Sequence, residues 1–146
     1  MKVLVAFESK GDTTKEYALA ITKALRNRGI VTDVFNVAKK MPEVSEYSTI
    51  VVGTGVRAGR MYKNILKFLR KDMKGKRVAL FFSTLQPKKQ VMEKYVGKIM
   101  KTNPELGIMS VGVFGGRFRI LFKTVADKFD LSAANIWAEE LADKIM

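Results

Sequence analysis

The sequence predicts a single-domain α/β protein with a five-stranded parallel sheet and helices on both faces of that sheet. Three observations lead to this fold class. Five short apolar runs alternate strictly with helical patterns along the 146 residues. The connections between successive runs are long enough for right-handed crossovers between parallel strands. Polar or glycine-rich turns follow the first and third runs, and the strand order 2-1-3-4-5 would bring both turns to one switch point.

The predicted strands are of the buried type found in parallel sheets, with continuous branched apolar residues rather than alternation. The run KVLVAF at residues 2–7, for example, ends at a polar stretch. Residues 38–47 are polar and contain a proline, so a loop or a short helix is expected there. The predicted strands cover residues 2–7, 30–37, 48–53, 77–83 and 108–114.

The helices are predicted from apolar residues that recur at three- and four-residue spacing. Thr13 followed by Glu16 fits a capping box, which places the first helix start at Thr13 or Thr14, and Gly29 is expected to end that helix. The last helix should begin at Asp130 or Ser132, with Ile136, Leu141 and Ile145 facing inward. The predicted helices cover residues 13–28, 60–72, 88–102 and 130–145.

Composition excludes several classes of chemistry. The chain has no cysteine and no histidine. Disulfides, iron–sulfur clusters, thiol catalysis and Ser-His nucleophile systems are therefore excluded, and no metal site is expected. No apolar run has the length of a membrane span, and the N-terminus lacks a signal-peptide pattern. These features predict a cytoplasmic protein, whose only expected membrane contact is peripheral, at the inner face of the membrane.

The charge is strongly positive and unevenly distributed. Lys and Arg number 27 against 14 Asp and Glu, which gives a net charge of +13. Residues 57–123 alone carry seventeen basic and three acidic residues. This excess indicates either a solvated surface or an anionic partner, such as an acidic substrate or redox partner, a membrane surface or nucleic acid. Nucleic acid is the least favoured, because no basic groove interleaved with aromatic residues is evident.

Residues 117–123 alternate basic with apolar residues in the order RFRILFK. Such a segment is too short to span a bilayer, but it can lie at a membrane surface, wall a substrate pocket or pack as an edge segment on the sheet. The sequence leaves these alternatives open. For Phe114 and Phe118, packing in the core is the simpler expectation.

A polar turn with many hydroxyl groups separates the first strand from the first helix. The backbone N–H groups that open a helix have no intrahelical partners, and the helix dipole favours an anion there. The turn therefore predicts a phosphate site, although an ordinary capped turn between a strand and a helix would have a similar sequence. It is neither a nucleoside-triphosphate loop nor a dinucleotide fingerprint, since it holds one glycine. The candidate residues are Ser9, Lys10, Gly11, Asp12, Thr13 and Thr14.

A glycine-rich loop is predicted after the third strand, over residues 53–59. It matches Gly-x-Gly-x-x-Ala, but it follows the wrong strand and lacks a downstream acidic residue, so a dinucleotide site is rejected. The glycines are instead expected to let backbone approach a flat ring closely. A phospho-acceptor regulator is also excluded, because the first strand ends with the single acid Glu8. The candidate residues are Gly53, Thr54, Gly55, Val56 and Arg57.

Residues 9–14 resemble the phosphate loop of flavodoxin-like FMN proteins, whose usual form is Ser/Thr-x-Thr-Gly-x-Thr. Ser9 and Thr14 match the ends of that motif, whereas Gly11 and Asp12 depart from its middle. Residues 50–69 and 111–122 resemble the branch that contains menaquinone-dependent protoporphyrinogen dehydrogenases. The resemblance implies a flavodoxin-like three-layer sandwich that binds FMN.

The same resemblance implies that three loops hold the FMN. Residues 9–14 would bind its phosphate, 53–60 would lie along the flavin ring, and 83–89 would lie on its other side. The third loop adds the candidates Ser83, Thr84 and Leu85. No aromatic residue occurs from Gly53 to Met61 or from Thr84 to Lys89, so one ring face is expected to be open.

The implied function is an FMN oxidoreductase that oxidises a porphyrinogen-like anionic substrate with a quinone-type acceptor. A flavodoxin-type electron carrier is the alternative, and a flavin-free nucleic-acid-binding module is a third hypothesis. No side chain is predicted to be catalytic, since the flavin supplies the redox chemistry. The oligomeric state is not predicted.

Overall fold

Five parallel strands form the central sheet of the structure, a computed structural model that describes residues 2–57, 59–120 and 123–146. At positions 57, 118–120 and 123–126 only the backbone is described. The strands follow one another across the sheet as β2-β1-β3-β5-β6. Among the parallel strands alone this is the predicted order 2-1-3-4-5, so the fold class is confirmed. The strands are β1 (Lys2–Glu8), β2 (Val31–Asn36), β3 (Thr49–Arg57), β5 (Arg77–Thr84) and β6 (Gly107–Gly115).

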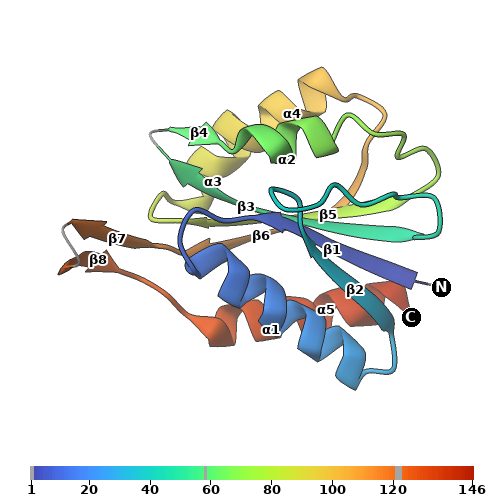
Figure 1. The fold of residues 1–146 in the computed structure, drawn as a ribbon, viewed down its shortest axis with the longest axis horizontal. Coiled ribbons are helices and arrows are strands. Elements are labelled where there is room, and N and C mark those ends of the chain that lie inside the picture. Colours follow the sequence, from blue (N-terminus) through green and yellow to red (C-terminus); the bar gives the residue numbers. More distant parts are fainter. Residues whose placement is uncertain (1, 58, 121–122) are drawn as a thin grey trace.

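Helices cover both faces of the sheet and make a three-layer sandwich (Figure 1). One layer contains α1 (Thr13–Asn27) and α5 (Leu131–Ile145). The other contains α2 (Lys63–Phe68) and one continuous helical segment with a π-helical turn in its middle. That segment consists of α3 (Lys88–Val91), η1 (Met92–Val96) and α4 (Gly97–Thr102).

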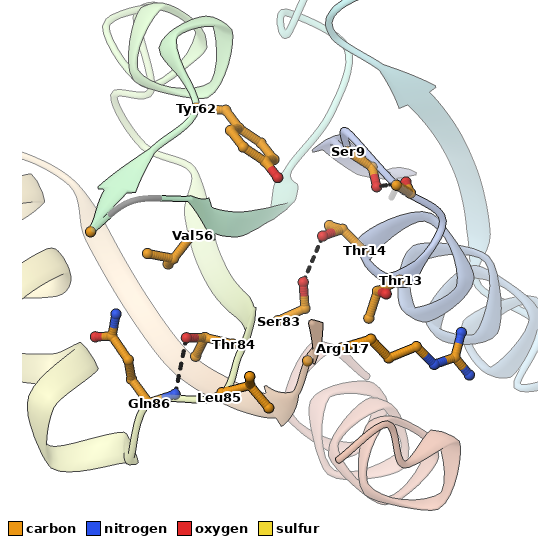
Figure 2. Close-up of a pocket in the computed structure, with 13 residues that line it drawn as sticks. Ser9, Thr13, Thr14, Val56, Tyr62, Ser83, Thr84, Leu85, Gln86 and Arg117 are labelled. Atoms are coloured by element: carbon orange, nitrogen blue, oxygen red, sulfur yellow. Dashed lines mark hydrogen bonds between the residues drawn. The ribbon is translucent and has the colours of Figure 1, made fainter. Parts of the chain in front are cut away.

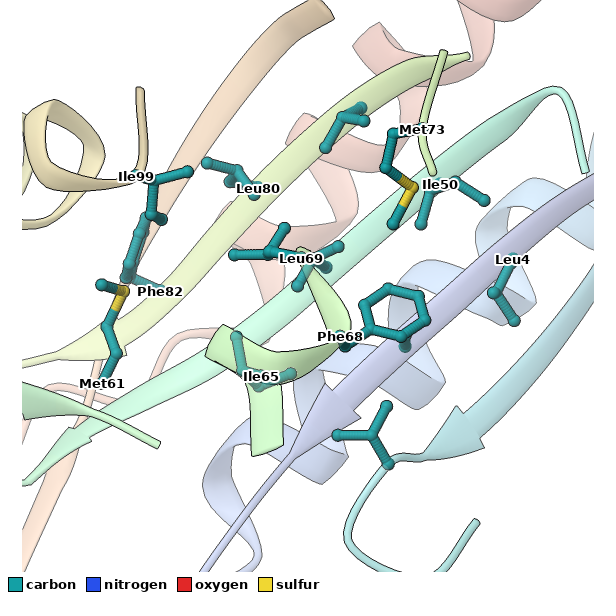
Figure 3. Close-up of a cluster of buried hydrophobic side chains, with 14 of the residues drawn as sticks. Leu4, Ile50, Met61, Ile65, Phe68, Leu69, Met73, Leu80, Phe82 and Ile99 are labelled. Atoms are coloured by element: carbon teal, nitrogen blue, oxygen red, sulfur yellow. The ribbon is translucent and has the colours of Figure 1, made fainter. Parts of the chain in front are cut away.

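Hydrophobic side chains fill the space on each side of the sheet. Along β1, Leu4 and Ala6 belong to the cluster beneath α2 and α4, whereas Val3, Val5 and Phe7 belong to the cluster beneath α1 and α5. Successive strand residues point to opposite faces, so a strand covered on both faces must be apolar throughout. Figure 3 shows the first cluster, with Ile65, Phe68 and Leu69 labelled on the segment of α2.

The first helix begins at Thr13 and is followed by Gly29 in a left-handed conformation with φ +79°, as predicted. The predicted capping box is wrong. Asp12 occupies the N-cap position, and its side chain makes no cap hydrogen bond within the described part of the chain. The Glu16 carboxylate instead accepts a hydrogen bond from Arg117 at 3.1 Å, because a distant arginine lies close enough to engage it.

The last helix begins at Leu131, and the Asp130 carboxylate caps it by accepting from the Ser132 backbone N–H at 3.0 Å. The prediction that side chains of this helix face the core is confirmed for Leu141 and Ile145. It is wrong for Ile136, which is 61% exposed. The inner face contains Ala134, Trp137, Ala138 and Leu141, and position 136 lies outside that stripe.

The predicted helix over residues 60–72 is much shorter in the structure. β3 continues to Arg57, and the chain then turns through Gly59 (φ +73°) into β4 (Arg60–Met61), which pairs antiparallel with β3. The predicted glycine-rich loop is therefore the end of a strand and a tight hairpin. The cause is pairing with β5, whose register continues as far as Gly55 opposite Ser83.

The Glu8 carboxylate at the end of β1 holds the N-terminus of α2. It is buried, and it accepts from the Asn64 backbone N–H at 3.1 Å and from the Asn64 amide at 2.8 Å. This contact acts as a helix cap supplied from another element.

Replacing Glu8 by alanine should lower the free energy of unfolding by about 1–3 kcal/mol, because two part-buried donors lose their acceptor. Denaturant unfolding measures the change, and Glu43→Ala, at an exposed loop position, is the control. Equal stability of the two variants would show that the Glu8 contact contributes nothing.

Residues 117–130 do not extend the main sheet. β7 (Arg117–Ile120) and β8 (Lys123–Asp127) pair antiparallel with each other and form a separate hairpin in the described part of the chain. The expectation of an edge segment on the sheet is therefore wrong. The side chains from Phe118 to Lys123 lie outside the described residues, so their membrane contact stays a prediction. Phe114, by contrast, is buried in the core as expected.

Candidate functional site

A cavity of about 280 Å³ lies where β1, β3 and β5 end (Figure 2). From β1 the chain passes to α1 on one face of the sheet, and from β3 it passes to α2 on the other. This divergence makes the switch point at which open α/β sheets bind ligands. The cavity is lined by Ser9, Gly11, Thr13, Thr14, Val56, Gly59, Tyr62, Ser83, Thr84, Leu85, Gln86, Gly116 and Arg117.

The structure brings eight of the fourteen candidate residues together around this cavity. These are Ser9, Gly11, Thr13, Thr14, Val56, Ser83, Thr84 and Leu85. Lys10 and Asp12 are exposed and do not line it. Thr54 is buried, and its hydroxyl donates to the Gly55 carbonyl at 2.8 Å. The Arg57 side chain lies outside the described residues.

The two glycines of β3 have different roles. A Cβ on Gly53 would lie 2.0 Å from the Phe81 ring, so this glycine makes room for a core phenylalanine. The expectation that it admits a flat ligand ring is therefore wrong. A Cβ on Gly55 would lie 3.3 Å from the Thr14 hydroxyl and 3.0 Å from the Tyr62 hydroxyl. Gly55 thus keeps two residues of the cavity wall close to the strand.

The N-terminus of α1 opens the phosphate-loop side of the cavity. Within the described part of the chain no side chain caps this helix, whereas Asp130 caps α5. The Ser9 hydroxyl donates to the Gly11 carbonyl and so closes the loop on itself. The first-turn N–H groups of α1, together with the Thr13 hydroxyl, suit an anion.

The Thr14 and Ser83 hydroxyls lie 2.6 Å apart in a buried hydrogen bond that joins α1 to the end of β5. Only one of the two hydroxyl hydrogens is used in this bond. The other oxygen keeps a hydrogen that it can donate to a ligand. The pair therefore connects the first and third predicted loops and can offer one hydroxyl hydrogen to a ligand.

Three of the lining residues, Tyr62, Gly116 and Arg117, lie outside the three loops predicted to hold FMN. Tyr62 follows the second of these loops closely in the sequence, and it places a ring in the cavity wall (Figure 2). The open face of the flavin ring stays a prediction. Gln86, within the predicted loop of residues 83–89, donates through its amide to the Tyr95 hydroxyl of η1 at 3.0 Å.

Arg117 lines the cavity beside the first turn of α1. For residues 117–123 the sequence left open a pocket wall, a membrane surface and an edge segment. Its guanidinium pairs with Glu16 at 3.1 Å and Asp127 at 3.3 Å, and it stacks on the Phe129 ring at 3.9 Å. These contacts fix the guanidinium beside the first turn of α1, and the two carboxylates partly compensate its charge. No Asp or Glu occurs among the described residues that line the cavity.

Comparison with known proteins decides the family. Residues 4–129 match the family described as flavodoxin domain, which is most of the chain. The chain belongs to the flavodoxin domain family. Solved structures that this flavodoxin domain resembles include the Streptococcus pneumoniae TIGR4 flavodoxin, with a TM-score of 0.72, 20% identity and 99% coverage of both chains. Oxidised flavodoxin 1 from Bacillus cereus gives a TM-score of 0.71 and 17% identity, and covers 100% of this chain and 99% of that one.

Two curated relatives match parts of the flavodoxin domain. Protoporphyrinogen IX dehydrogenase (quinone) of Escherichia coli K12 is 31% identical over 72 residues, which are 49% of this chain and 40% of the relative. An uncharacterized protein of Methanocaldococcus jannaschii is 34% identical over 86 residues, which are 58% of this chain and 54% of the relative. The matched region thus spans about half or less of each relative.

Membership of the flavodoxin family indicates FMN as the cofactor. The cavity fits this cofactor chemically. Its phosphate-loop side offers the uncapped start of α1, several hydroxyl groups and Arg117, and it lacks carboxylates among the described lining residues. A dianionic phosphate is stabilised by each of these features.

Replacing Thr14 by alanine should weaken FMN binding about tenfold or more, because hydrogen bonds to charged groups contribute about 1.5–3 kcal/mol. The domain should still fold. Quenching of FMN fluorescence gives the affinity, and Thr14→Ser, which keeps the hydroxyl, is the matched control. Unchanged affinity in the alanine variant would remove Thr14 from the phosphate site.

Proposed function

We propose that this flavodoxin-family chain is an FMN-dependent oxidoreductase that oxidises an anionic, porphyrinogen-like substrate and passes the electrons to a quinone-type acceptor. The observation that carries the proposal is the cavity at the uncapped start of α1, which offers hydroxyl donors and has no carboxylate among its described lining residues. The 31% identity to protoporphyrinogen IX dehydrogenase (quinone) over 72 residues supports the substrate and acceptor classes.

The residues of the cavity divide into two groups by chemistry. The start of α1, with Ser9, Thr13 and Thr14, would hold the phosphate, and Arg117 would add positive charge there. Val56 and Leu85, from β3 and the loop after β5, are the apolar lining residues that would contact the flavin ring. FMN, when bound, supplies the redox chemistry, and the protein supplies binding and electrostatics.

A lysine stands at the rim of the cavity. The Lys94 ammonium, carried by η1, lies 3.2 Å from the position that a Cβ on Gly59 would occupy, and Gly59 lines the cavity. Lys94 was not among the candidate residues of the sequence analysis. A positive charge at this rim favours the anionic reduced flavin and attracts an anionic substrate.

Replacing Lys94 by glutamine should lower the potential at which the bound flavin is reduced to its anionic form by about 20–40 mV. A unit charge about 10 Å away contributes roughly 0.5–1 kcal/mol at intermediate dielectric. For one electron, 1.4 kcal/mol corresponds to about 59 mV. Redox titration at two salt concentrations measures the shift, with Lys23→Gln on the opposite layer as the control. A potential that responds neither to this variant nor to salt would argue against the electrostatic effect.

The enzyme proposal is tested by turnover. Protein reconstituted with FMN is given protoporphyrinogen IX and menadione, and porphyrin fluorescence is followed against protein-free and FMN-free controls. We expect porphyrin formation that depends on the protein, on FMN and on the quinone. Each pair of hydrogens lost by the porphyrinogen should reduce one quinone to quinol. A rate equal to that of the protein-free control would reject the enzyme proposal.

An electron carrier of flavodoxin type is the second candidate function. It is favoured by the exposed basic side chains of α3, η1 and α4, which suit a protein partner and of which Lys94 lies at the rim of the cavity. A carrier would bind FMN and exchange electrons with a redox protein without oxidising protoporphyrinogen. A colourless protein that gains no FMN on reconstitution would reject both flavin functions and return the basic surface to nucleic-acid binding.

A further inference from the structure

The helix layer formed by α2, α3, η1 and α4 is strongly basic. Its helices, residues 63–68 and 88–102, contain seven basic residues and one acidic, a net charge of +6. In the opposite layer, residues 13–28 contain four basic residues and one acidic, and residues 131–146 contain one basic and three acidic. The sheet therefore separates a basic layer from a nearly neutral one. The exposed basic side chains of the basic layer are Lys63, Lys67, Arg70, Lys74, Lys88, Lys89, Lys94, Lys98 and Lys101.

Exposed methionines lie among these charges. Met92 on η1 is 38% exposed and Met100 on α4 is 53% exposed, whereas the aromatic residues Phe68 and Tyr95 of the same layer are buried. Methionine side chains adapt to varied protein surfaces. Insertion into a membrane interface relies more on Trp, Phe and Leu, which are not among the exposed residues of these helices.

The basic layer reaches the rim of the cavity. Lys94 approaches Gly59, and the Gln86 amide in the cavity wall donates to Tyr95 of η1 at 3.0 Å. Leu85, which lines the cavity, is 38% exposed. A molecule docked on this layer over η1 would therefore lie beside the cavity.

We propose that the basic layer docks an acidic redox protein that exchanges electrons with FMN in the cavity, an inference that rests on the proposed FMN function. Charge complementarity identifies the partner, because a net charge of +6 on the helices of this face steers an acidic protein toward it. Electron-transfer encounters bury little surface, so a few methionines among many lysines suffice as apolar contacts. Fast, salt-sensitive association is the expected behaviour.

The probe is an acidic plant-type [2Fe–2S] ferredoxin, reduced beforehand and mixed with the FMN-loaded protein. Each ferredoxin gives up one electron, and two of them with one proton reduce one FMN to its anionic reduced form. The rate of flavin bleaching should fall about tenfold or more as salt screens the charges. Reduced cytochrome c, a basic protein, serves as a binding control in gel filtration and should not associate.

Two matched charge-reversal variants locate the surface. Lys98→Glu/Lys101→Glu alters α4, and Lys23→Glu/Lys144→Glu removes the same net charge from the opposite layer, with all four side chains exposed. At low salt we expect the α4 variant to react with ferredoxin about tenfold more slowly and the control variant to lose less than about twofold. Both should keep wild-type FMN affinity and melting temperature, since neither touches the cavity.

The outcomes separate this inference from the proposed function. Failure to bind FMN would overturn the proposed function itself. Normal FMN binding with equal slowing in both variants would overturn the docking surface, because net charge alone would then explain the rate. Two results together would also overturn the docking surface and assign the layer to a membrane. In that case the wild type and the control variant sediment with phosphatidylserine vesicles and the α4 variant does not, while the rate with ferredoxin is the same in all three.

Discussion

Replacement of Gly53 by alanine is expected to lower the free energy of unfolding by about 3 kcal/mol. The new Cβ would lie 2.0–2.5 Å from three atoms of the Phe81 ring. Phe81 is fully buried and packs against Phe114 and Trp137 at centroid distances of 5.8 and 6.1 Å. The ring therefore has little room to withdraw, and overpacking of this kind costs about 1–3 kcal/mol or more.

A second-site change tests the cause. Phe81→Leu removes the ring that meets the new methyl group, so Gly53→Ala/Phe81→Leu should be more stable than the sum of the two single effects predicts. Denaturant unfolding supplies the four free energies. Gly11→Ala is the control, since no described atom outside its chain neighbours lies within 4 Å of its added Cβ. Strict additivity would mean that Phe81 is not the obstacle.

Riboflavin, which lacks the phosphate, is expected to bind at least about a hundredfold more weakly than FMN. Two hydrogen bonds to a charged phosphate contribute at least about 3 kcal/mol, and about 1.4 kcal/mol corresponds to a factor of ten. The uncapped start of α1 and the nearby Arg117 supply the donors and the charge. Arg117→Gln should weaken FMN binding while it leaves riboflavin binding unchanged.

Fluorescence titration of both flavins with wild type and variant measures the four affinities. Lys23→Gln, on the exposed face of α1, is the control and should preserve the preference for FMN. Equal affinities for the two flavins would place the phosphate outside this loop. Equal weakening of both flavins in Arg117→Gln would show that Arg117 supports the fold of the site rather than the phosphate.

Local sequence patterns determined the five parallel strands, the start of α1 at Thr13 and the turn at Gly29. Buried parallel strands need continuous apolar residues, and a left-handed turn favours glycine, so each of these features depends on residues that are neighbours in the chain. The order of the parallel strands places the Ser9–Thr14 turn and the end of β5 at the same edge of the sheet, where both line one cavity.

Tertiary contacts decided the rest, because they join residues that no local pattern relates. Glu16 pairs with Arg117, which lies 101 positions along the chain, and so leaves no capping box. Gly53 serves the Phe81 ring on the neighbouring strand, and pairing with β5 turns a glycine-rich loop into strand and hairpin. Tyr62 and Arg117 enter the cavity only because the folded sheet brings their segments to its edge. Side-chain contacts between distant segments depend on three-dimensional distance, which hydrophobic periodicity does not encode.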